Sequence, residues 1–378
     1  MHSLNPAKLK LELMAYGIAR GSGLPDTLTN PFGLVHLVLP DELAVSTHIS
    51  QSPYTLHSKE GHYFLETKNG TTSNAVDIPV LWTEPLHCYQ KKTSSGILVG
   101  DILTVHGKFI AVHPKGPCRF GLSGLACRYC GSSKELSSHP PFTKKDLIEA
   151  IKIVLAEKRC DIVNLSSGRV ETDDGGIEWL SPWVTEIRKH LNILISLDLS
   201  LPKTTDWIDR AYAIGVDALY YDTNFENEAE YTRQLETVKY ASKIFPPGAV
   251  LSHLILGFES LEDTKKNMLR LIAAGTIPIL IYFPPQENSN LNEHWTLTPD
   301  QSMSLYGFLY EQLLKANLTA HWVQQHDVVL TPLEGRYFSS SGNSGKLLTL
   351  RNFFETGFGR SIRFGLARLR RHLRVVPE

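Results

Sequence analysis

From Lys108 onward the chain alternates short β-branched runs with longer amphipathic stretches, and this alternation constrains the fold more than any other feature. Short apolar runs indicate strands, and apolar residues at a period near 3.6 indicate helices. The expected strands are 108–113, 161–165, 191–197, 216–221, 250–256 and 277–283, and the expected helices are 142–158, 176–190, 203–214, 227–244, 260–274 and 298–316. Because each unit is long enough for a right-handed crossover, we expect six parallel strands.

Six β-then-α units fit either a doubly wound sheet or a barrel-like α/β fold, and we expect a partial (β/α)6 TIM-like barrel over residues 108–330. The segment 1–107 reads as a small β-rich N-terminal domain that covers the barrel, with a helix near 6–19 and strands at 33–40, 43–49, 61–67 and 76–82. Residues 331–378 form a C-terminal extension. Both architectures place their chemistry at the carboxyl ends of the strands.

Composition excludes two broad classes of protein. The formal net charge of the 378 residues is −1, so the basic excess of a nucleic-acid or membrane-surface binder is missing. The sequence holds no apolar run long enough to cross a membrane, and its start makes a poor signal peptide. Five cysteines form a poor disulfide framework. We therefore expect a cytoplasmic protein with free thiols.

Three of the five cysteines fall within 13 residues, at Cys118, Cys127 and Cys130. They lie in the loop after the first expected strand of the barrel. Three thiolates in one loop can bind zinc, with His113 or His139 as a fourth ligand, or an iron–sulfur cluster with one iron left open. They can also be separate buried thiols, because free cysteine packs as a small hydrophobe.

The run Cys127-Arg128-Tyr129-Cys130 resembles the second half of the cluster loop of radical S-adenosylmethionine (SAM) enzymes. That family usually has C-x3-C-x2-C with an aromatic residue before the last cysteine. Here eight residues separate Cys118 from Cys127, which departs from the family pattern. The resemblance implies that Cys118, Cys127 and Cys130 hold a [4Fe–4S] cluster beside Tyr129.

Later loops add to this resemblance in the family's order. NLSSG (164–168) stands where the family has a polar motif for the methionine amino group, and YDTNFENEAEY (221–231) is similar to the ribose-binding stretch of biotin and lipoyl synthases. SHLILGFESLEDT (252–264) resembles the region that packs on adenine. The SAM-binding residues that the resemblance implies are Ser166, Ser167, Gly168, Asn224, Glu226, Arg233, Leu254 and Leu256.

The function implied is reductive cleavage of SAM at the cluster and abstraction of a hydrogen atom from a small-molecule substrate, with flavodoxin or ferredoxin as the reductant. Cys88 and Cys160 are expected to be structural thiols, which leaves too few cysteines for a second cluster. Substrate residues are expected at Asp198, Asp222, His321 and His326. Two alternatives stay open: a radical SAM enzyme that modifies a peptide or RNA, and a zinc-stabilised α/β binding protein.

Two C-terminal segments carry further expectations. Residues 320–338 are expected to add a strand, with His321, His326 and Asp327 near its ends. The tail 360–374 combines six arginines with apolar residues in an amphipathic pattern. It is either a docking surface for an acidic partner, such as a flavodoxin, or for a nucleic acid, or it is a terminal helix with a solvated basic face.

Overall fold

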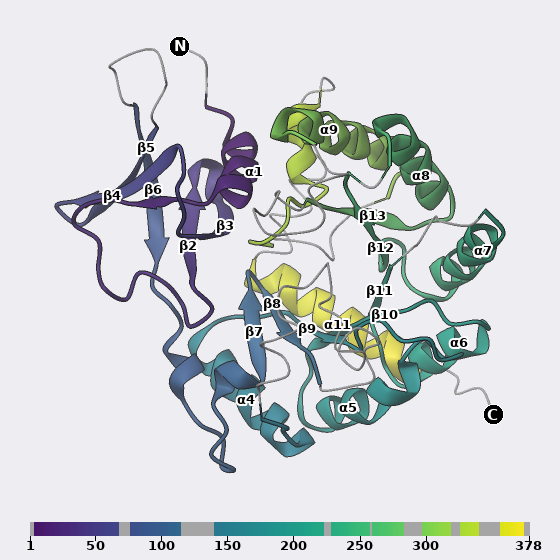
Figure 1. The fold of residues 1–378 in the computed structure, drawn as a ribbon. Coiled ribbons are helices and arrows are strands. Elements are labelled where there is room, and N and C mark those ends of the chain that lie inside the picture. Colours follow the sequence, from purple (N-terminus) through teal and green to yellow (C-terminus); the bar gives the residue numbers. More distant parts are fainter. Residues whose placement is uncertain are drawn as a thin grey trace.

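The structure is a computed structural model that describes residues 4–67, 76–114, 140–222, 228–257, 259–282, 297–318, 326–339 and 356–373. Within these residues the chain forms a six-stranded N-terminal sheet and a seven-stranded sheet that curls into a partial TIM-like barrel. Figure 1 shows the two sheets side by side, with helices around the outside of the curled sheet.

The curled sheet has the strand order β13-β12-β11-β10-β9-β8-β7. Neighbouring strands from β8 to β13 pair in parallel, which confirms the six expected parallel strands. An additional strand, β7, pairs antiparallel with β8 at the edge, so this sheet begins before the expected start at residue 108. The strands are β7 Leu103–His106, β8 Phe109–Val112, β9 Ile162–Ser166, β10 Leu194–Leu199, β11 Ala218–Asp222, β12 Val250–Ile255 and β13 Ile277–Ile281.

A helix follows each of the parallel strands. These helices are α4 Lys144–Glu157, α5 Ile177–His190, α6 Asp206–Ala213, α7 Glu228–Ile244, α8 Leu261–Ala273 and α9 Pro299–Lys315, within a few residues of the expected bounds. The expected N-cap at Thr143 is confirmed: its hydroxyl accepts from the Asp146 amide, and the Asp146 carboxylate accepts from the Thr143 amide. This reciprocal capping box fixes where α4 begins.

The N-terminal sheet has the order β1-β4-β5-β6-β2-β3 and is mostly antiparallel, with only β1 and β4 parallel among its described pairs. Its elements are α1 Pro6–Tyr16, β1 Ala19–Arg20, β2 Leu34–Leu39, η1 Pro40–Glu42, β3 Leu43–His48, β4 Tyr54–Lys59, β5 His62–Thr67 and β6 Val76–Thr83; the short helices η2 His87–Gln90 and η3 Val99–Asp101 lead to the barrel. Strand β4 was not expected from the sequence, because its half-polar residues lack a clean alternation.

Residues 326–339 hold the N-terminal unit against the barrel. The Lys10 ammonium of α1 pairs with the Glu334 carboxylate at 3.0 Å, and both side chains are nearly removed from water. The strand expected over 320–338 is wrong for its described part, because residues 326–333 form bends and a turn before the short helix η4 Glu334–Phe338. Their backbone instead bonds to the N-terminal unit, where the Ser46 amide donates to the Asp327 carbonyl at 2.8 Å.

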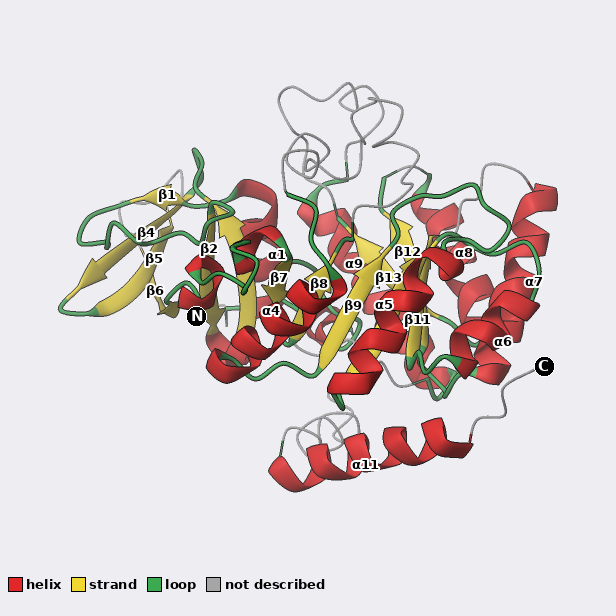
Figure 2. Cartoon of the chain, turned by 90° about the horizontal axis from the view of Figure 1, so that it is seen from below, coloured by secondary structure: helices red, strands yellow, loops and turns green. Residues whose placement is uncertain are grey.

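Helix α11, Gly357–Leu373, crosses the end of the barrel at which the strands begin (Figure 2). Arg360 and Arg363 pair with Asp161 just before β9, at 2.7 and 2.6 Å, and Arg371 pairs with Asp217 just before β11 at 3.0 Å. The expectation of a solvated basic face is therefore wrong for these three arginines, because they neutralise two buried carboxylates inside the fold.

The described part of the chain holds no helix with the length and apolarity needed to cross a membrane.

Candidate functional site

The carboxyl ends of β8 to β13 meet at one edge of the curled sheet, where this architecture places its chemistry. Figure 2 shows that edge opposite α11. The loop after β8 contains the three clustered cysteines, and the loop after β11 contains the ribose-like motif. Cys118, Cys127, Cys130, Tyr129, Asn224, Glu226 and His321 lie outside the described residues, as does the side chain of Asp222, so their roles stay predictions.

The SSG motif forms a tight turn directly after β9. The Ser166 hydroxyl accepts from the Gly168 amide at 3.2 Å, and Gly168 has φ 66°, a conformation that glycine adopts without strain. Ser167 is fully buried, and a Cβ on Gly176 at the start of α5 would come within 2.7 Å of its Cβ. Ser166 and the Gly168 backbone therefore lie nearer to a ligand at this edge than the Ser167 side chain does.

The predicted adenine contacts Leu254 and Leu256 are both buried. Strand pairing puts His253 opposite Ile279 and Leu254 opposite Leu280, so Leu254 shares the face of the sheet that packs on the helices. Ile255 points the other way, with His253. An adenine contact by Leu254 and Leu256 stays a prediction, and their packing in the core between the sheet and the helices needs no ligand.

Arg233, the predicted partner of the SAM carboxylate, lies in the second turn of α7. Its guanidinium donates to the carbonyl of Pro202, in the loop that leaves β10, at 3.4 Å. The contact holds the side chain near the carboxyl edge of the sheet. The predicted pairing with a SAM carboxylate is not tested by this arrangement.

The inward face of the barrel brings together Asp198 of β10, Tyr220 of β11 and His253 of β12. Asp198 and Tyr220 are register partners, and His253 lies on the same face of the next strand. Asp198 Oδ1 is 3.9 Å from His253 Nδ1, and the Tyr220 and His253 ring centroids are 5.6 Å apart. Asp198 and His253 keep 27% and 21% of their side-chain exposure, so both face accessible space.

Burial in the barrel raises the pKa of Tyr220, and the nearby Asp198 carboxylate raises it further. The phenol is therefore protonated throughout the physiological range and can donate a hydrogen bond. Beneath it, the Ser196 hydroxyl donates to the Asn164 side-chain oxygen at 3.0 Å across β10 and β9. Ser196 and Asn164 therefore extend the polar lining of the barrel interior from Asp198 towards the end at which the strands begin.

Sequence reasoning missed Tyr220, His253 and Asn164 as members of a common lining. The alternation within each strand already indicated which residues share a face, because positions two apart point to the same side of a sheet. Which of the two faces is inward, and which strands are neighbours, is fixed only by the curled arrangement of the sheet.

His326, a predicted substrate residue, lies deep between the barrel and the N-terminal unit. Its ring stacks on His106 of β7 at 6.0 Å, and burial lowers its pKa to about 3. The imidazole is therefore neutral near pH 7. Its role as a substrate contact stays a prediction.

Next to it, the Asp327 carboxylate lies 3.3 Å from His36 and 3.5 Å from His106, joining the N-terminal sheet to the barrel. Burial would raise its pKa, but hydrogen bonds to His106 and His36 lower the pKa of this carboxyl well below its ordinary value.

His113, considered in the sequence as a zinc ligand, follows β8 at the carboxyl edge. Burial lowers the pKa of its imidazole, and a hydrogen bond to the Ser166 backbone partly opposes that effect. The described residues contain no group of three or more His, Cys, Asp or Glu side chains placed to hold a metal ion.

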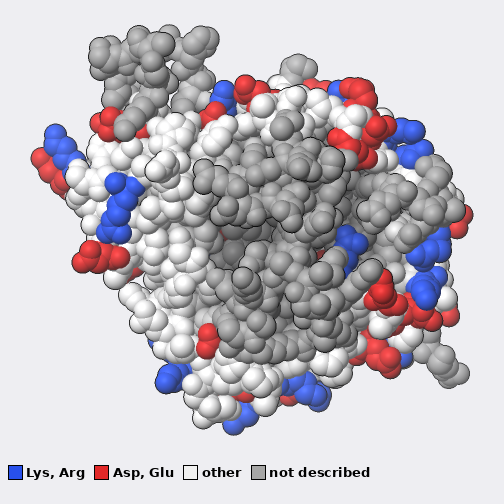
Figure 3. All heavy atoms as spheres, viewed as in Figure 1, with Lys and Arg blue, Asp and Glu red and all other residues white. Residues whose placement is uncertain are grey.

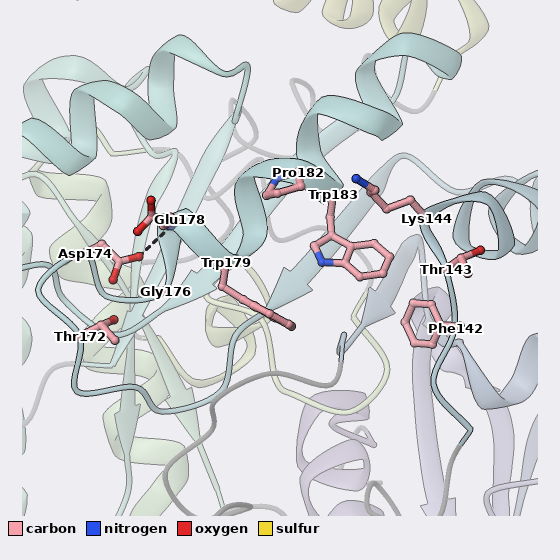
Figure 4. A pocket seen from close by; sticks show the side chains of 10 residues that line it. All are labelled: Phe142, Thr143, Lys144, Thr172, Asp174, Gly176, Glu178, Trp179, Pro182 and Trp183. Atoms are coloured by element: carbon pink, nitrogen blue, oxygen red, sulfur yellow. Dashed lines mark hydrogen bonds between the residues drawn. The ribbon is translucent and has the colours of Figure 1, made fainter.

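A separate aromatic pocket of about 610 Å³ opens outside the barrel, between the start of α4 and the first turns of α5 (Figure 4). The Phe142 and Trp183 rings meet edge to face on one side of it, with their centroids 5.4 Å apart, while Asp174 and Glu178 lie at the other end. Its walls come from the segments that follow β8 and β9, so it lies on the outer rim of the same edge.

Charged side chains of both signs are interspersed around the periphery of the face seen in Figure 3. No extended basic patch appears among the described residues of this view. The even distribution agrees with the near-zero net charge.

No protein-family model and no curated protein matches the sequence. Among solved structures, methylornithine synthase (PylB) is similar with a TM-score of 0.37 and 14% identity, over 46% of this chain and 54% of that chain. A truncated form of 3-deoxy-D-arabino-heptulosonate 7-phosphate synthase from Thermotoga maritima gives a TM-score of 0.30 and 13% identity, over 56% of this chain and 76% of that chain. The chain thus spans about half the length of the first of these enzymes, and the likeness concerns the fold.

Proposed function

We propose that this chain is a radical SAM enzyme that acts on a small molecule. The observation that carries the proposal is the parallel order of β8 to β13. It brings the starts of the loops after β8, β9, β11 and β12 to one edge, and these are the loops whose sequences resemble the cluster and SAM motifs of the family. In a fold with another strand direction or order the same motifs would be dispersed.

In this proposal Cys118, Cys127 and Cys130 hold a [4Fe–4S] cluster, which together with SAM supplies the one-electron chemistry and the hydrogen-abstracting radical. Ser166 and Gly168 bind the methionine end of SAM, and Asn224 and Glu226 bind its ribose. Asparagine offers both a donor and an acceptor, and a carboxylate accepts from two hydroxyls, which suits a ribose diol.

The two remaining cysteines support a single cluster. Cys88 and Cys160 are both buried, and burial raises the pKa of their thiols to about 12 and about 11. A protonated thiol is a poor metal ligand. Cys160 precedes β9 at the floor of the barrel, where its carbonyl accepts from Arg360 at 3.1 Å, so it lies at the opposite end from the cysteine loop.

The electron donor is proposed to be a flavodoxin or ferredoxin that docks at the mouth of the barrel. Helix α11 is a poor docking surface for it, because the helix lies at the other end of the strands and three of its arginines are ion-paired within the fold. A short path for the electron requires a donor near the loop after β8.

The test is anaerobic reconstitution of the full-length protein with iron and sulfide. Because one [4Fe–4S] cluster is proposed, the expected iron content is about four per chain. After reduction, the protein is expected to release 5′-deoxyadenosine from SAM. The matched variants are Cys118→Ala, which is expected to lose the cluster, and Cys160→Ala, which is expected to retain it.

A colourless zinc protein that never releases 5′-deoxyadenosine would overturn the proposal and favour the zinc-stabilised binding protein. An intact cluster in Cys118→Ala would remove that residue from the ligand set. Turnover that requires a peptide or RNA would replace the small-molecule part of the proposal.

A further inference from the structure

We propose that the outer face of α11 binds the surface of a membrane that contains anionic lipids, with the helix lying in the plane of the headgroups. The surface is at the end of the barrel where the strands begin, so the inference does not depend on the chemistry proposed for the opposite end. Its support comes from the apolar face of α11, from the place of the helix in the fold, and from charge.

The apolar face of α11 points away from the protein. Four of its large apolar side chains are between 54% and 72% exposed: Phe358, Leu366, Leu369 and Leu373. Their separations of eight, three and four residues put them on one side of a helix with 3.6 residues per turn. We call these four side chains the apolar stripe. An exposed stripe of this kind marks an interaction surface.

The other side of α11 is the one that the fold buries. It contains the arginines that pair with Asp161 and Asp217, and Ala367 between them is fully buried. A surface helix ordinarily packs its apolar side on the core and turns its charges to water. Here two buried carboxylates take up the arginines, so the apolar stripe faces outward instead.

The place of α11 suits a flat surface. Figure 2 shows the helix running across the end of the barrel, with none of the other described elements on its outer side. A helix of this length extends about 25 Å at 1.5 Å per residue. An amphipathic helix that binds a membrane lies in the interface with its apolar side among the headgroups and upper acyl chains. The apolar stripe can make that contact along the whole helix.

The charge of α11 favours anionic headgroups over neutral ones. The helix contains no aspartate or glutamate, and Arg368 and His372 are exposed on the side of the helix next to the apolar stripe. Basic side chains beside an inserted apolar stripe are attracted by the negative surface potential of anionic lipids.

The ends of the barrel helices add positive charge at the same end of the molecule. Each helix from α5 to α9 has a basic residue in its last turn, and α4, α5, α6, α8 and α9 have acidic residues in their first turns. Helix α4 ends on Glu157, and Lys158 and Arg159 follow it directly. This arrangement complements the helix dipoles. The near-zero net charge of the chain, from which no membrane-surface binder was expected, is therefore compatible with a positive end.

A second copy of the chain fits the apolar stripe less well. Two paired α11 helices would bring the basic residues of both copies together, and neither helix has an acidic residue to compensate them. Like charges that face each other across an interface are unfavourable.

The experiment is flotation of the full-length protein with lipid vesicles in a density gradient. One set of vesicles contains phosphatidylcholine alone, and the other contains equal amounts of phosphatidylcholine and phosphatidylglycerol. The protein is expected to float with the mixed vesicles, to float much less with phosphatidylcholine alone, and to bind less in high salt. Failure to float with the mixed vesicles, or equal flotation with both kinds, would overturn the proposal.

A double substitution tests the apolar stripe. Leu366→Gln with Leu369→Gln is expected to weaken binding to the mixed vesicles about tenfold or more, from the transfer free energy of two leucine side chains. The matched control is Leu81→Gln with Leu269→Gln, which replaces two exposed leucines on β6 and α8 and is expected to bind like the wild type. Equal losses in the two double variants would contradict a role for the stripe.

A single substitution tests the charge and covers the case that the leucine variant does not fold. Arg368→Gln is expected to weaken binding to the mixed vesicles about fivefold, from the usual attraction of one basic residue to an anionic surface. Lys59→Gln, at an exposed position on β4 of the N-terminal unit, is the control and is expected to bind normally. An Arg368→Gln protein that binds as tightly as the control would remove the charge argument.

Light scattering without lipid tests the other occupant. Monomers of both the wild type and the Leu366→Gln, Leu369→Gln variant would support a stripe that is open to lipid. A wild-type dimer that the same variant converts to a monomer would assign the stripe to a second copy and overturn the lipid proposal.

Discussion

Asp217 accepts a hydrogen bond from Arg371 at 3.0 Å, although 154 residues separate the two along the chain. Asp217 immediately precedes β11, and Arg371 lies in the last turn of α11. Arg188 of α5 pairs with the same carboxylate at 2.5 Å. The ion pair between Asp217 and Arg371 holds the C-terminal helix against the end of the barrel at which the strands begin. In this architecture that end contributes to stability, and the opposite end carries the chemistry.

We expect Asp217→Asn to lower the free energy of unfolding by about 3 kcal/mol, because it leaves two partly buried guanidinium groups without their shared counter-ion. Urea denaturation at neutral pH measures the change. Arg368→Ala, an exposed arginine on the same helix, is the matched control and is expected to change the midpoint little. Equal effects of the two substitutions would contradict the role assigned to the ion pair.

Stability is expected to fall as the pH drops from 6.5 towards 3 because of His326. Burial lowers the pKa of this histidine from 6.5 to about 3, so in this window the unfolded chain binds a proton that the folded chain excludes. The unfolded state holds more protons, and stability therefore rises with pH, at up to about 1.4 kcal/mol per pH unit for one group.

His326→Phe removes this titration and is expected to flatten the dependence of unfolding free energy on pH between about 4.5 and 6.5, a window set by the ordinary histidine and aspartate pKa values. Urea titrations at a series of pH values give the slopes. His372→Gln, at an exposed position on α11, should leave the slope unchanged. A slope that persists in His326→Phe would assign the effect to other groups.

Asp146 is expected to contribute stability that is lost in acid. Burial would raise its pKa, but hydrogen bonds from Thr143 and Thr93 lower the pKa to about 2. A depressed carboxyl pKa stabilises the fold above the unfolded value near 3.9 and loses that effect as the pH falls towards 2.

Asp146→Asn should cost about 1–2 kcal/mol at neutral pH, from the lost cap and the lost bond to Thr93. The difference from wild type should shrink as the pH falls below about 4. Asp263→Asn is the comparison, because Asp263 occupies the same position of α8, bonds to Ser260 at 2.6 Å and is exposed. A larger loss for Asp263→Asn would show that burial does not strengthen the cap.

Cys88 and Cys160 are expected to resist alkylation in the folded protein. Burial raises the pKa of both thiols, so the reactive thiolate is scarce as well as inaccessible. Iodoacetamide at pH 8 followed by peptide mass mapping measures the modification, and the urea-unfolded chain is the positive control. Rapid labelling of either cysteine in the native protein would contradict their burial.

The alternation of six βα units was readable from sequence because each strand and helix carries its own periodicity. The helix starts were readable for the same reason: Thr143 and Asp146 lie three residues apart in one turn and cap it locally. Strand β4 was missed because its half-polar residues lack a clean alternation; its pairing with β5, the next strand along the chain, is what defines it.

The sequence by itself determined the parallel βα order, the burial of Cys88 and Cys160, and the edge of the sheet at which the motif loops emerge. Only the tertiary structure decided that Asp198 of β10 lies close to His253 of β12, with β11 between them. It also decided that the arginines of α11 neutralise Asp161 and Asp217. The physical reason is that periodicity is a local property, whereas charge pairing depends on which segments the fold brings within a few ångströms. A basic amphipathic helix has the same pattern whether its arginines face water or two buried aspartates.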